Sequence, residues 1–84
     1  MSPERLPLAM TGEGERVTVV AVIGGRALQK RLFDLGIVVG KELTVIQRQS
    51  EGPMVAAVGD ARLALGLGVT HKILVTPVIG EVKR

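Results

Sequence analysis

The sequence predicts one small, mainly β domain whose strands curl into a barrel. Its 84 residues are 46% hydrophobic and 23% charged, which suits a single compact core. Eleven glycines fall mostly between short apolar runs, a pattern typical of strands joined by tight turns. The chain holds about five such runs, and a small sheet of this kind hides its edges by closing on itself.

The N-terminal segment, residues 1–16, contains two prolines and is expected to begin irregularly. Leu6, Leu8 and Met10 alternate with other residues, so their side chains are expected to form one apolar edge that packs against the rest of the domain. The single domain is expected to span residues 1–84, with frayed tails at 1–5 and 80–84.

The first clear strand is expected over residues 16–23, where β-branched residues dominate. Every second residue from Val17 to Ile23 would lie on one face of this strand, and the residues between them on the other. Both faces are largely apolar, so the strand is expected to be covered on both sides or curled within a barrel.

Two glycines end this strand, and residues 26–35 then predict a short helix. Leu28, Leu32 and Leu35 are spaced at i, i+4 and i+7, so they would form one apolar stripe facing the sheet. The stripe predicts that the helix packs on the barrel through these three side chains.

The end of this helix is the best-specified local feature of the sequence. Gly36 stands where a left-handed residue closes a helix, and Ile37 follows it. In such an arrangement, a Schellman motif, Ile37 contacts Leu32 one turn back. A further glycine, Gly40, opens the next turn.

The rest of the chain predicts short strands at residues 42–49, 54–58, 61–64 and 72–76. Residues 50–53 read Ser-Glu-Gly-Pro and are expected to join the first two of these strands as a hairpin. Residues 65–71 predict a turn or a single helical turn, weakened by two glycines. Five strands with one short helix after the first long strand favour an SH3-like β-barrel, and an OB-like barrel is the alternative.

The residue types disfavour enzymes and metal sites. Cysteine is absent, which removes disulfides, thiolate metal sites and cysteine nucleophiles together. The single histidine, His71, is far in sequence from Asp34 and Asp60, and is expected at the surface or a strand edge. We therefore expect no catalytic residue, no metal ligand and no cofactor.

The chain is expected in the cytoplasm. No apolar run approaches the ~20 residues that a membrane span needs, so direct membrane insertion is not expected. The N-terminus lacks the apolar core of a signal peptide. A small exported domain commonly needs disulfides, and this chain can form none.

The net charge of +3 permits an acidic partner without requiring one. Arg26, Lys30 and Arg31 form the tightest internal basic group, and Lys30 can pair with Asp34 four residues on. Single-stranded nucleic acid binds by stacking bases on aromatic side chains, and Phe33 is the sole aromatic residue. A docking domain for another protein is therefore favoured, and a small basic barrel that binds nucleic acid is the alternative.

The segment from Gly25 to Ile37, followed by Gly40, resembles the signature of the FeoA family of small ferrous iron transport proteins. The family's pattern is an Arg-Leu pair, two variable residues, Leu-Gly-Ile or Leu-Gly-Leu, and then a glycine. The matching residues are Arg31-Leu32, Leu35-Gly36-Ile37 and Gly40. The resemblance covers about residues 6–77, because the hairpin around Gly52-Pro53, the segment Arg62-Leu63-Ala64-Leu65 and the closing strand Ile73-Leu74-Val75 also match the family in order and spacing.

This resemblance implies an SH3-like barrel and an accessory role in ferrous iron uptake. The implied partner is the large membrane transporter FeoB, whose cytoplasmic part binds GTP, and which this protein would modulate by docking.

The residues expected to contact the partner are the charged ones of the helix: Arg26, Lys30, Arg31 and Asp34. Arg31 is the strongest candidate because it also lies in the motif. The residues expected to be architectural are Gly25, Leu32, Leu35, Gly36 and Gly40. Pairing of two copies through an open barrel edge is left open.

Overall fold

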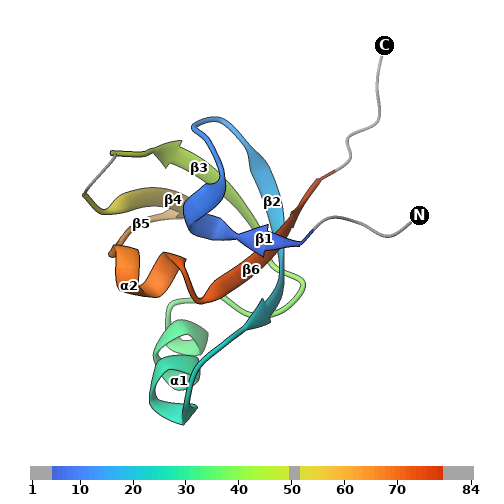
Figure 1. Cartoon of the computed structure of the whole chain (residues 1–84), viewed down its shortest axis with the longest axis vertical. Coiled ribbons are helices and arrows are strands. Elements are labelled where there is room, and N and C mark those ends of the chain that lie inside the picture. Colours follow the sequence, from blue (N-terminus) through green and yellow to red (C-terminus); the bar gives the residue numbers. More distant parts are fainter. Residues whose placement is uncertain (1–4, 50–51, 79–84) are drawn as a thin grey trace.

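Six strands form one curled antiparallel sheet in the part of the chain that the structure describes, residues 5–49 and 52–78 of a computed structural model (Figure 1). The strand order is β1-β6-β2-β3-β4-β5, so β1 and β5 are the outer strands. The elements are β1 (Leu6–Pro7), the 3-10 helix η1 (Leu8–Met10), β2 (Arg16–Val22), α1 (Arg26–Asp34), β3 (Glu42–Gln47), β4 (Met54–Val58), β5 (Ala61–Leu65), α2 (Leu67–Thr70) and β6 (Ile73–Pro77). The prediction of a mainly β domain with one helix after the first long strand is confirmed.

The N-terminal segment adds a sixth strand that the sequence analysis did not predict. β1 pairs with β6, with Leu6 opposite Val75. The chain then turns into η1, where Leu8 is fully buried but Met10 is 65% exposed. The expected apolar edge through Met10 is therefore wrong, because alternation holds for an extended strand and not for a helix with three residues per turn.

The end of β2 departs from simple alternation. Val17 and Val19 point into the core as expected, but the pairing of β2 with β6 shifts register between Val19 and Ala21. Such a bulge exchanges the two faces of a strand beyond it. Val22 consequently packs against the core, while Ile23, expected on the face of Val17, is 54% exposed.

The helix end forms the Schellman motif that the sequence predicts. The Ile37 N–H donates to the Leu32 carbonyl oxygen at 2.8 Å, and the Gly36 N–H donates to that of Phe33 at 2.9 Å. Gly36 has φ +88°, a left-handed conformation that favours glycine. Leu35 is 40% exposed, so its expected place in the apolar stripe is wrong. Because the chain reverses at Gly36, Ile37 fills the core position instead.

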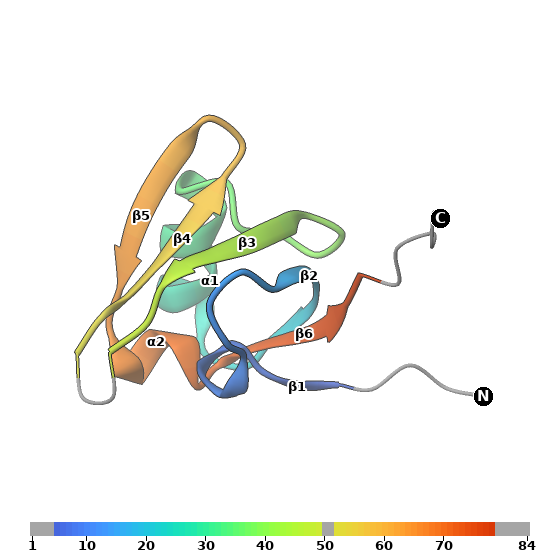
Figure 2. The same ribbon diagram turned by 90° about the horizontal axis from the view of Figure 1, so that it is seen from above.

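The remaining elements follow the expected order. β4 has the predicted bounds, β3 ends two residues early, and β5 and β6 differ by one residue from their predictions. α2 is the single helical turn expected between them, and His71 is its exposed C-cap. Figure 2 shows β3, β4 and β5 side by side, as two successive hairpins place them. The turn residues 50–51 and the tails at 1–4 and 79–84 lie outside the described residues.

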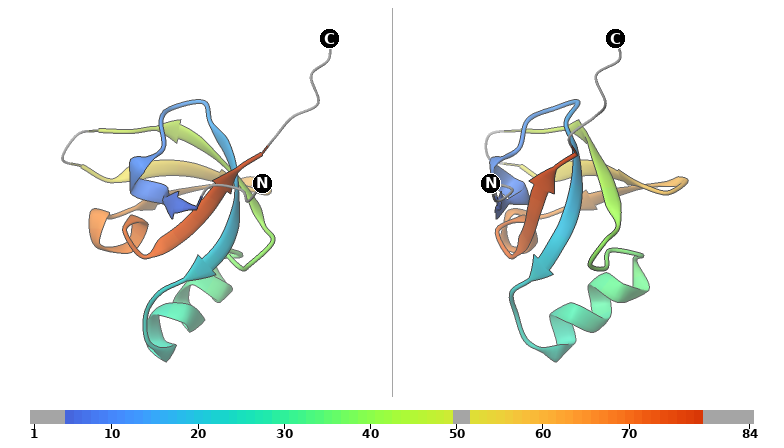
Figure 3. Two further views of the ribbon diagram at one scale, coloured as in Figure 1. Left: turned by 45° about the vertical axis from the view of Figure 1, so that its right-hand side comes forward. Right: turned by 90° about the vertical axis from the view of Figure 1, so that its right-hand side faces the viewer.

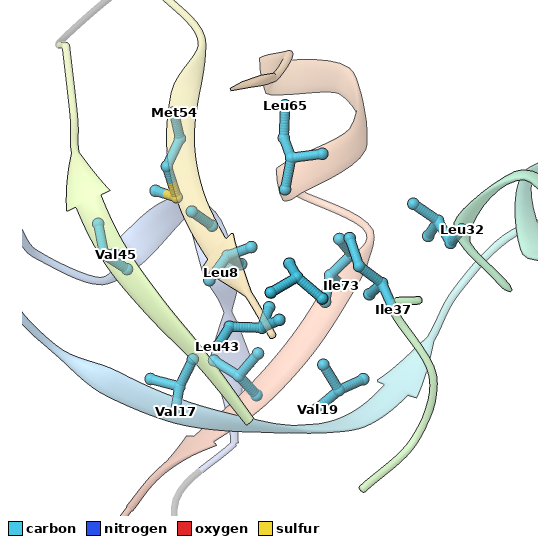
Figure 4. Packing of buried hydrophobic residues seen from close by; sticks show 13 residues of the cluster. Leu8, Val17, Val19, Leu32, Ile37, Leu43, Val45, Met54, Leu65 and Ile73 are labelled. Atoms are coloured by element: carbon cyan, nitrogen blue, oxygen red, sulfur yellow. The ribbon is translucent and has the colours of Figure 1, made fainter. Parts of the chain in front are cut away.

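The core lies inside the curl of the sheet and is wholly aliphatic apart from one methionine (Figure 4). Strands on opposite sides of the curl contribute to it, and α1 adds a single buried side chain. The cluster consists of Leu8, Val17, Val19, Leu32, Ile37, Leu43, Val45, Met54, Ala56, Val58, Leu65, Ile73 and Val75. In the described residues, no helix is long and apolar enough to cross a membrane.

Candidate docking surface

The helix α1 stands apart from the sheet, in the connection between β2 and β3 (Figure 3). Leu32 is its buried anchor and Leu28 packs partly against the core. At its start, a Cβ on Gly24 would come within 2.7 Å of the Cδ2 atom of Leu28, so any other residue there would require the Leu28 side chain to shift. Gly25 is the N-cap, and a Cβ on it would meet nothing. Most of the surface of α1 therefore stays open to solvent.

The charged side chains of α1 lie on this open surface. The Lys30 ammonium contacts the Asp34 carboxylate at 3.1 Å, which confirms the expected i,i+4 pair. Both side chains are more than half exposed, so the pair contributes little to stability. Arg26 and Arg31 are exposed and make no ion pair with any other residue that the structure describes.

An apolar surface surrounds the same helix. Within the described residues, eight large hydrophobic side chains are exposed, and five of these lie on α1 or in the segments that flank it. The most exposed of these five are Phe33 at 67% and Val39 at 65%. The five are Ile23, Phe33, Leu35, Val38 and Val39, which we call the α1 apolar surface. Three of them, Phe33, Val38 and Val39, line one depression, and apolar side chains that gather on the surface in this way commonly mark an interaction site.

Part of this surface is hollowed. A depression of about 340 Å³, which we call the α1 hollow, lies between α1 and the segment that follows it. Its lining consists of Val22, Gln29, Lys30, Phe33, Ile37, Val38 and Val39. The bulge in β2 supplies Val22, and the Schellman motif supplies Ile37, so two fold features described above shape the hollow.

The far wall of the hollow is fixed by backbone hydrogen bonds to β2. The Gly40 N–H donates to the Val19 carbonyl at 2.8 Å, and the Val19 N–H donates to the Lys41 carbonyl at 2.9 Å. A turn bond from the Lys41 N–H to the Val38 carbonyl, at 2.9 Å, closes the segment. Gly40 has φ +94°, which favours glycine at this turn. Val38 and Val39 are thereby held opposite α1.

The four charged residues expected to contact a partner are not equivalent. Lys30 lines the hollow, and Asp34 reaches it through the ion pair. Arg31 lies two positions before Phe33, which on a helix is the opposite flank. Arg26 and Arg31 are absent from the lining. Phe33, Val38 and Val39 were not predicted as site residues from the sequence, although two signals pointed to them: Phe33 is an aromatic residue off the apolar stripe, and the two valines stand between two glycines.

The side chains that line the hollow are mainly apolar. The hollow offers aliphatic and aromatic carbon, one ammonium and one amide side chain. Among residues 5–49 and 52–78, no group of three or more His, Cys, Asp or Glu residues is placed to hold a metal ion.

Comparison with known proteins assigns the family. The family model described as the FeoA domain matches residues 6–77. The chain belongs to the FeoA family. A protein of Methanocaldococcus jannaschii named "Putative Fe(2+) transport protein A" is 38% identical over 69 residues, covering 82% of this chain and 83% of that protein.

Solved FeoA structures have the same fold. The crystal structure of an iron uptake regulatory protein (FeoA) matches 89% of this chain and all of its own, with a TM-score of 0.85 and 28% identity. Stenotrophomonas maltophilia FeoA, solved with zinc and described as an SH3 domain protein, matches 83% of this chain and 88% of its own, at a TM-score of 0.73 and 24% identity. The prediction of an SH3-like barrel, rather than an OB-like one, is confirmed.

Proposed function

We propose that this FeoA-family protein is a non-catalytic, cytoplasmic accessory of ferrous iron uptake. In this proposal it docks, through the surface around α1, on the cytoplasmic GTP-binding part of an FeoB-type transporter and modulates that transporter. Membership of the FeoA family and the name of the M. jannaschii relative support the link to ferrous iron transport. The docking face is inferred from the α1 apolar surface.

The observation that carries the proposal is the position of Phe33. It is the sole aromatic residue of the chain, yet it is 67% exposed while an otherwise aliphatic core forms without it. Burying a phenylalanine side chain is worth roughly 1.5–3 kcal/mol, and aromatic side chains are enriched in protein interfaces. A partner that covers Phe33 gains this energy, whereas the isolated domain does not.

The proposed modulation follows from differential binding. A docking protein shifts an equilibrium between two states of its partner only when it binds one state more tightly than the other. Modulation of a GTP-binding transporter therefore requires an affinity that depends on the bound nucleotide. This requirement makes the proposal testable by binding alone, without an iron transport assay.

The experiment is a calorimetric titration of the protein into the purified cytoplasmic part of the cognate transporter. It is run without nucleotide, with GDP and with a non-hydrolysable GTP analogue. We expect saturable binding whose affinity differs between these states. An absence of binding in all three states would overturn the docking proposal, and equal affinity in all three would overturn the proposed modulation.

A further inference from the structure

We propose that the α1 hollow accepts an apolar side chain of a partner segment that also carries a neighbouring carboxylate. The carboxylate would pair with Lys30. The identification of that segment as part of the transporter rests on the proposed function, but the chemistry of the hollow does not. The docking surface therefore recognises an acidic, apolar stretch of polypeptide.

The shape of the hollow favours a projecting side chain. Its volume of about 340 Å³ lies at the low end of the roughly 300–1,000 Å³ typical of ligand pockets. Two of its lining residues, Phe33 and Val39, are about two-thirds exposed and stand at its sides, whereas Ile37 is almost fully buried. A side chain inserted between them would touch apolar carbon on several sides.

The hollow is preformed rather than created by binding. One wall is the helix, closed by the hydrogen bonds from Gly36 and Ile37. The other wall is held by the bonds between Gly40, Val19 and Lys41. Walls that are ordered before association reduce the entropy lost on binding. The backbone geometry therefore supports recognition of a short segment.

The charges at the hollow favour a carboxylate. Lys30 is the charged residue of the lining, and Arg26 lies one turn before it on the same helix. Arg31 is a third basic residue of α1, on the flank away from the hollow. Against these basic residues α1 carries one acid, Asp34. Complementarity of charge therefore selects an acidic partner.

Lys30 is free to change partner. Its contact with Asp34 is an exposed i,i+4 pair at 3.1 Å, with side chains 76% and 57% exposed. Pairs of this kind contribute little to stability. An incoming carboxylate beside a filled apolar hollow would be partly shielded from water, where a charge pair is stronger than at the open surface. Exchange of Asp34 for the partner's carboxylate therefore costs the fold little stability.

Two other occupants fit the observations less well. An anionic lipid surface is recognised by apolar side chains that project outward, whereas this site is concave. A second copy of the chain would bring another surface with an excess of Arg and Lys, and like charges repel. An acidic polypeptide segment fits both the concave shape of the hollow and the positive charge beside it.

The test uses two synthetic peptides with the same Leu-Phe-Leu centre, one flanked by glutamates and one by lysines. Each is titrated into the isotopically labelled full chain, and backbone amide shifts are followed by NMR. We expect the glutamate peptide to shift the amides of Gln29, Phe33 and Val39, and to bind about tenfold more tightly than the lysine peptide. Equal binding of both peptides, or shifts elsewhere only, would overturn the proposal.

A charge-swap variant separates charge from stability. Lys30→Glu with Asp34→Lys reverses the charge at the hollow but keeps the ion pair and the net charge, and a Glu-to-Lys order suits a helix. We expect the peptide preference to reverse. The matched control is Arg16→Glu with Glu42→Arg, which swaps the other exposed ion pair of the described chain and should keep the original preference. An unchanged preference in the Lys30 variant would contradict the role of Lys30.

Two further measurements distinguish the proposals from one another. Vesicles of phosphatidylcholine and phosphatidylglycerol that shift the same amides, when neither peptide does, would assign the surface to lipid and overturn the inference. If the transporter fragment binds the charge-swapped and original proteins equally, the proposed function stands and the inference fails. If the glutamate peptide occupies the hollow but the fragment does not bind, the inference stands and the proposed partner is wrong.

Discussion

The backbone N–H of Ile37 donates to the carbonyl oxygen of Leu32 at 2.8 Å, and both side chains are 1% exposed. This relationship ties the end of α1 to the core and turns the chain back toward β2. It also places Ile37 at the α1 hollow, with Phe33 and Val39 exposed at its sides. One local motif therefore links the stability of the helix to the shape of the proposed docking surface.

Replacing Gly36 by alanine is expected to destabilise the fold by about 1–2 kcal/mol, because a residue with a Cβ is strained at φ +88°. The space itself is adequate, since the added Cβ would lie 3.6 Å from Val58. Gly68→Ala is the matched control. It lies within α2 at an ordinary φ with open space, and should be neutral or stabilising. Urea denaturation measures both, and equal effects would contradict the left-handed helix end.

Leu32→Ala is expected to cost about 2–5 kcal/mol, because it removes a buried side chain and leaves a cavity. Leu35→Ala makes the same chemical change three residues on, where the side chain is 40% exposed. Its effect should be small, within about 0.5 kcal/mol. A comparison of thermal melts decides the matter, and a comparable loss in the Leu35 variant would show that the apolar stripe extends to that residue after all.

Arg48 holds the N-terminal segment to the end of β3. Its guanidinium donates to the Ala9 carbonyl at 3.0 Å, and its backbone N–H donates to the Glu13 carboxylate at 2.9 Å. Arg48→Met keeps the backbone hydrogen bond to Glu13 and removes the side-chain hydrogen bond to Ala9. We therefore expect the free energy of unfolding to fall by about 1–2 kcal/mol. Arg62→Met, at an exposed position of β5, serves as the control. We also expect the backbone amides of η1 to exchange hydrogen faster in the Arg48 variant but not in the Arg62 variant.

Nucleic-acid binding, the alternative raised by the sequence, can be tested through the salt dependence of the affinity. A phosphate-binding surface loses affinity steeply as salt rises. We expect no measurable binding of a fluorescent single-stranded oligonucleotide at low salt, because the sole aromatic side chain offers no row of stacking partners. Tight binding that disappears with added salt would favour the alternative over protein docking.

Features set by neighbouring residues could be predicted from the sequence. The Schellman motif depends on Gly36, Ile37 and Leu32, which lie within six residues of one another, and it was predicted correctly. The hairpin strands could likewise be predicted from alternation and turn residues. The resemblance to the FeoA family, based on the same segment, was also correct.

Features set by distant pairing could not be predicted. The bulge in β2 arises where it pairs with β6, so the exchange between Val22 and Ile23 has no signal in β2 itself. Met10 was misplaced because the 3-10 helix follows a two-residue strand that exists only against β6. The α1 hollow needs three separate segments, from Val22 to Val39, to come together. The sequence therefore pointed to Arg31, which does not line the hollow. The role of Arg31 in docking stays a prediction.

The most direct test of the docking account compares two exposed apolar positions. Phe33 is 67% exposed on α1, and Met10 is 65% exposed on η1, outside the α1 apolar surface. The measurement is the affinity of Phe33→Ser and Met10→Ser for the transporter's cytoplasmic part in its tightest-binding nucleotide state. The account predicts that binding is lost in the Phe33 variant and kept in the Met10 variant, with both still folded. Unchanged binding by the Phe33 variant would contradict it.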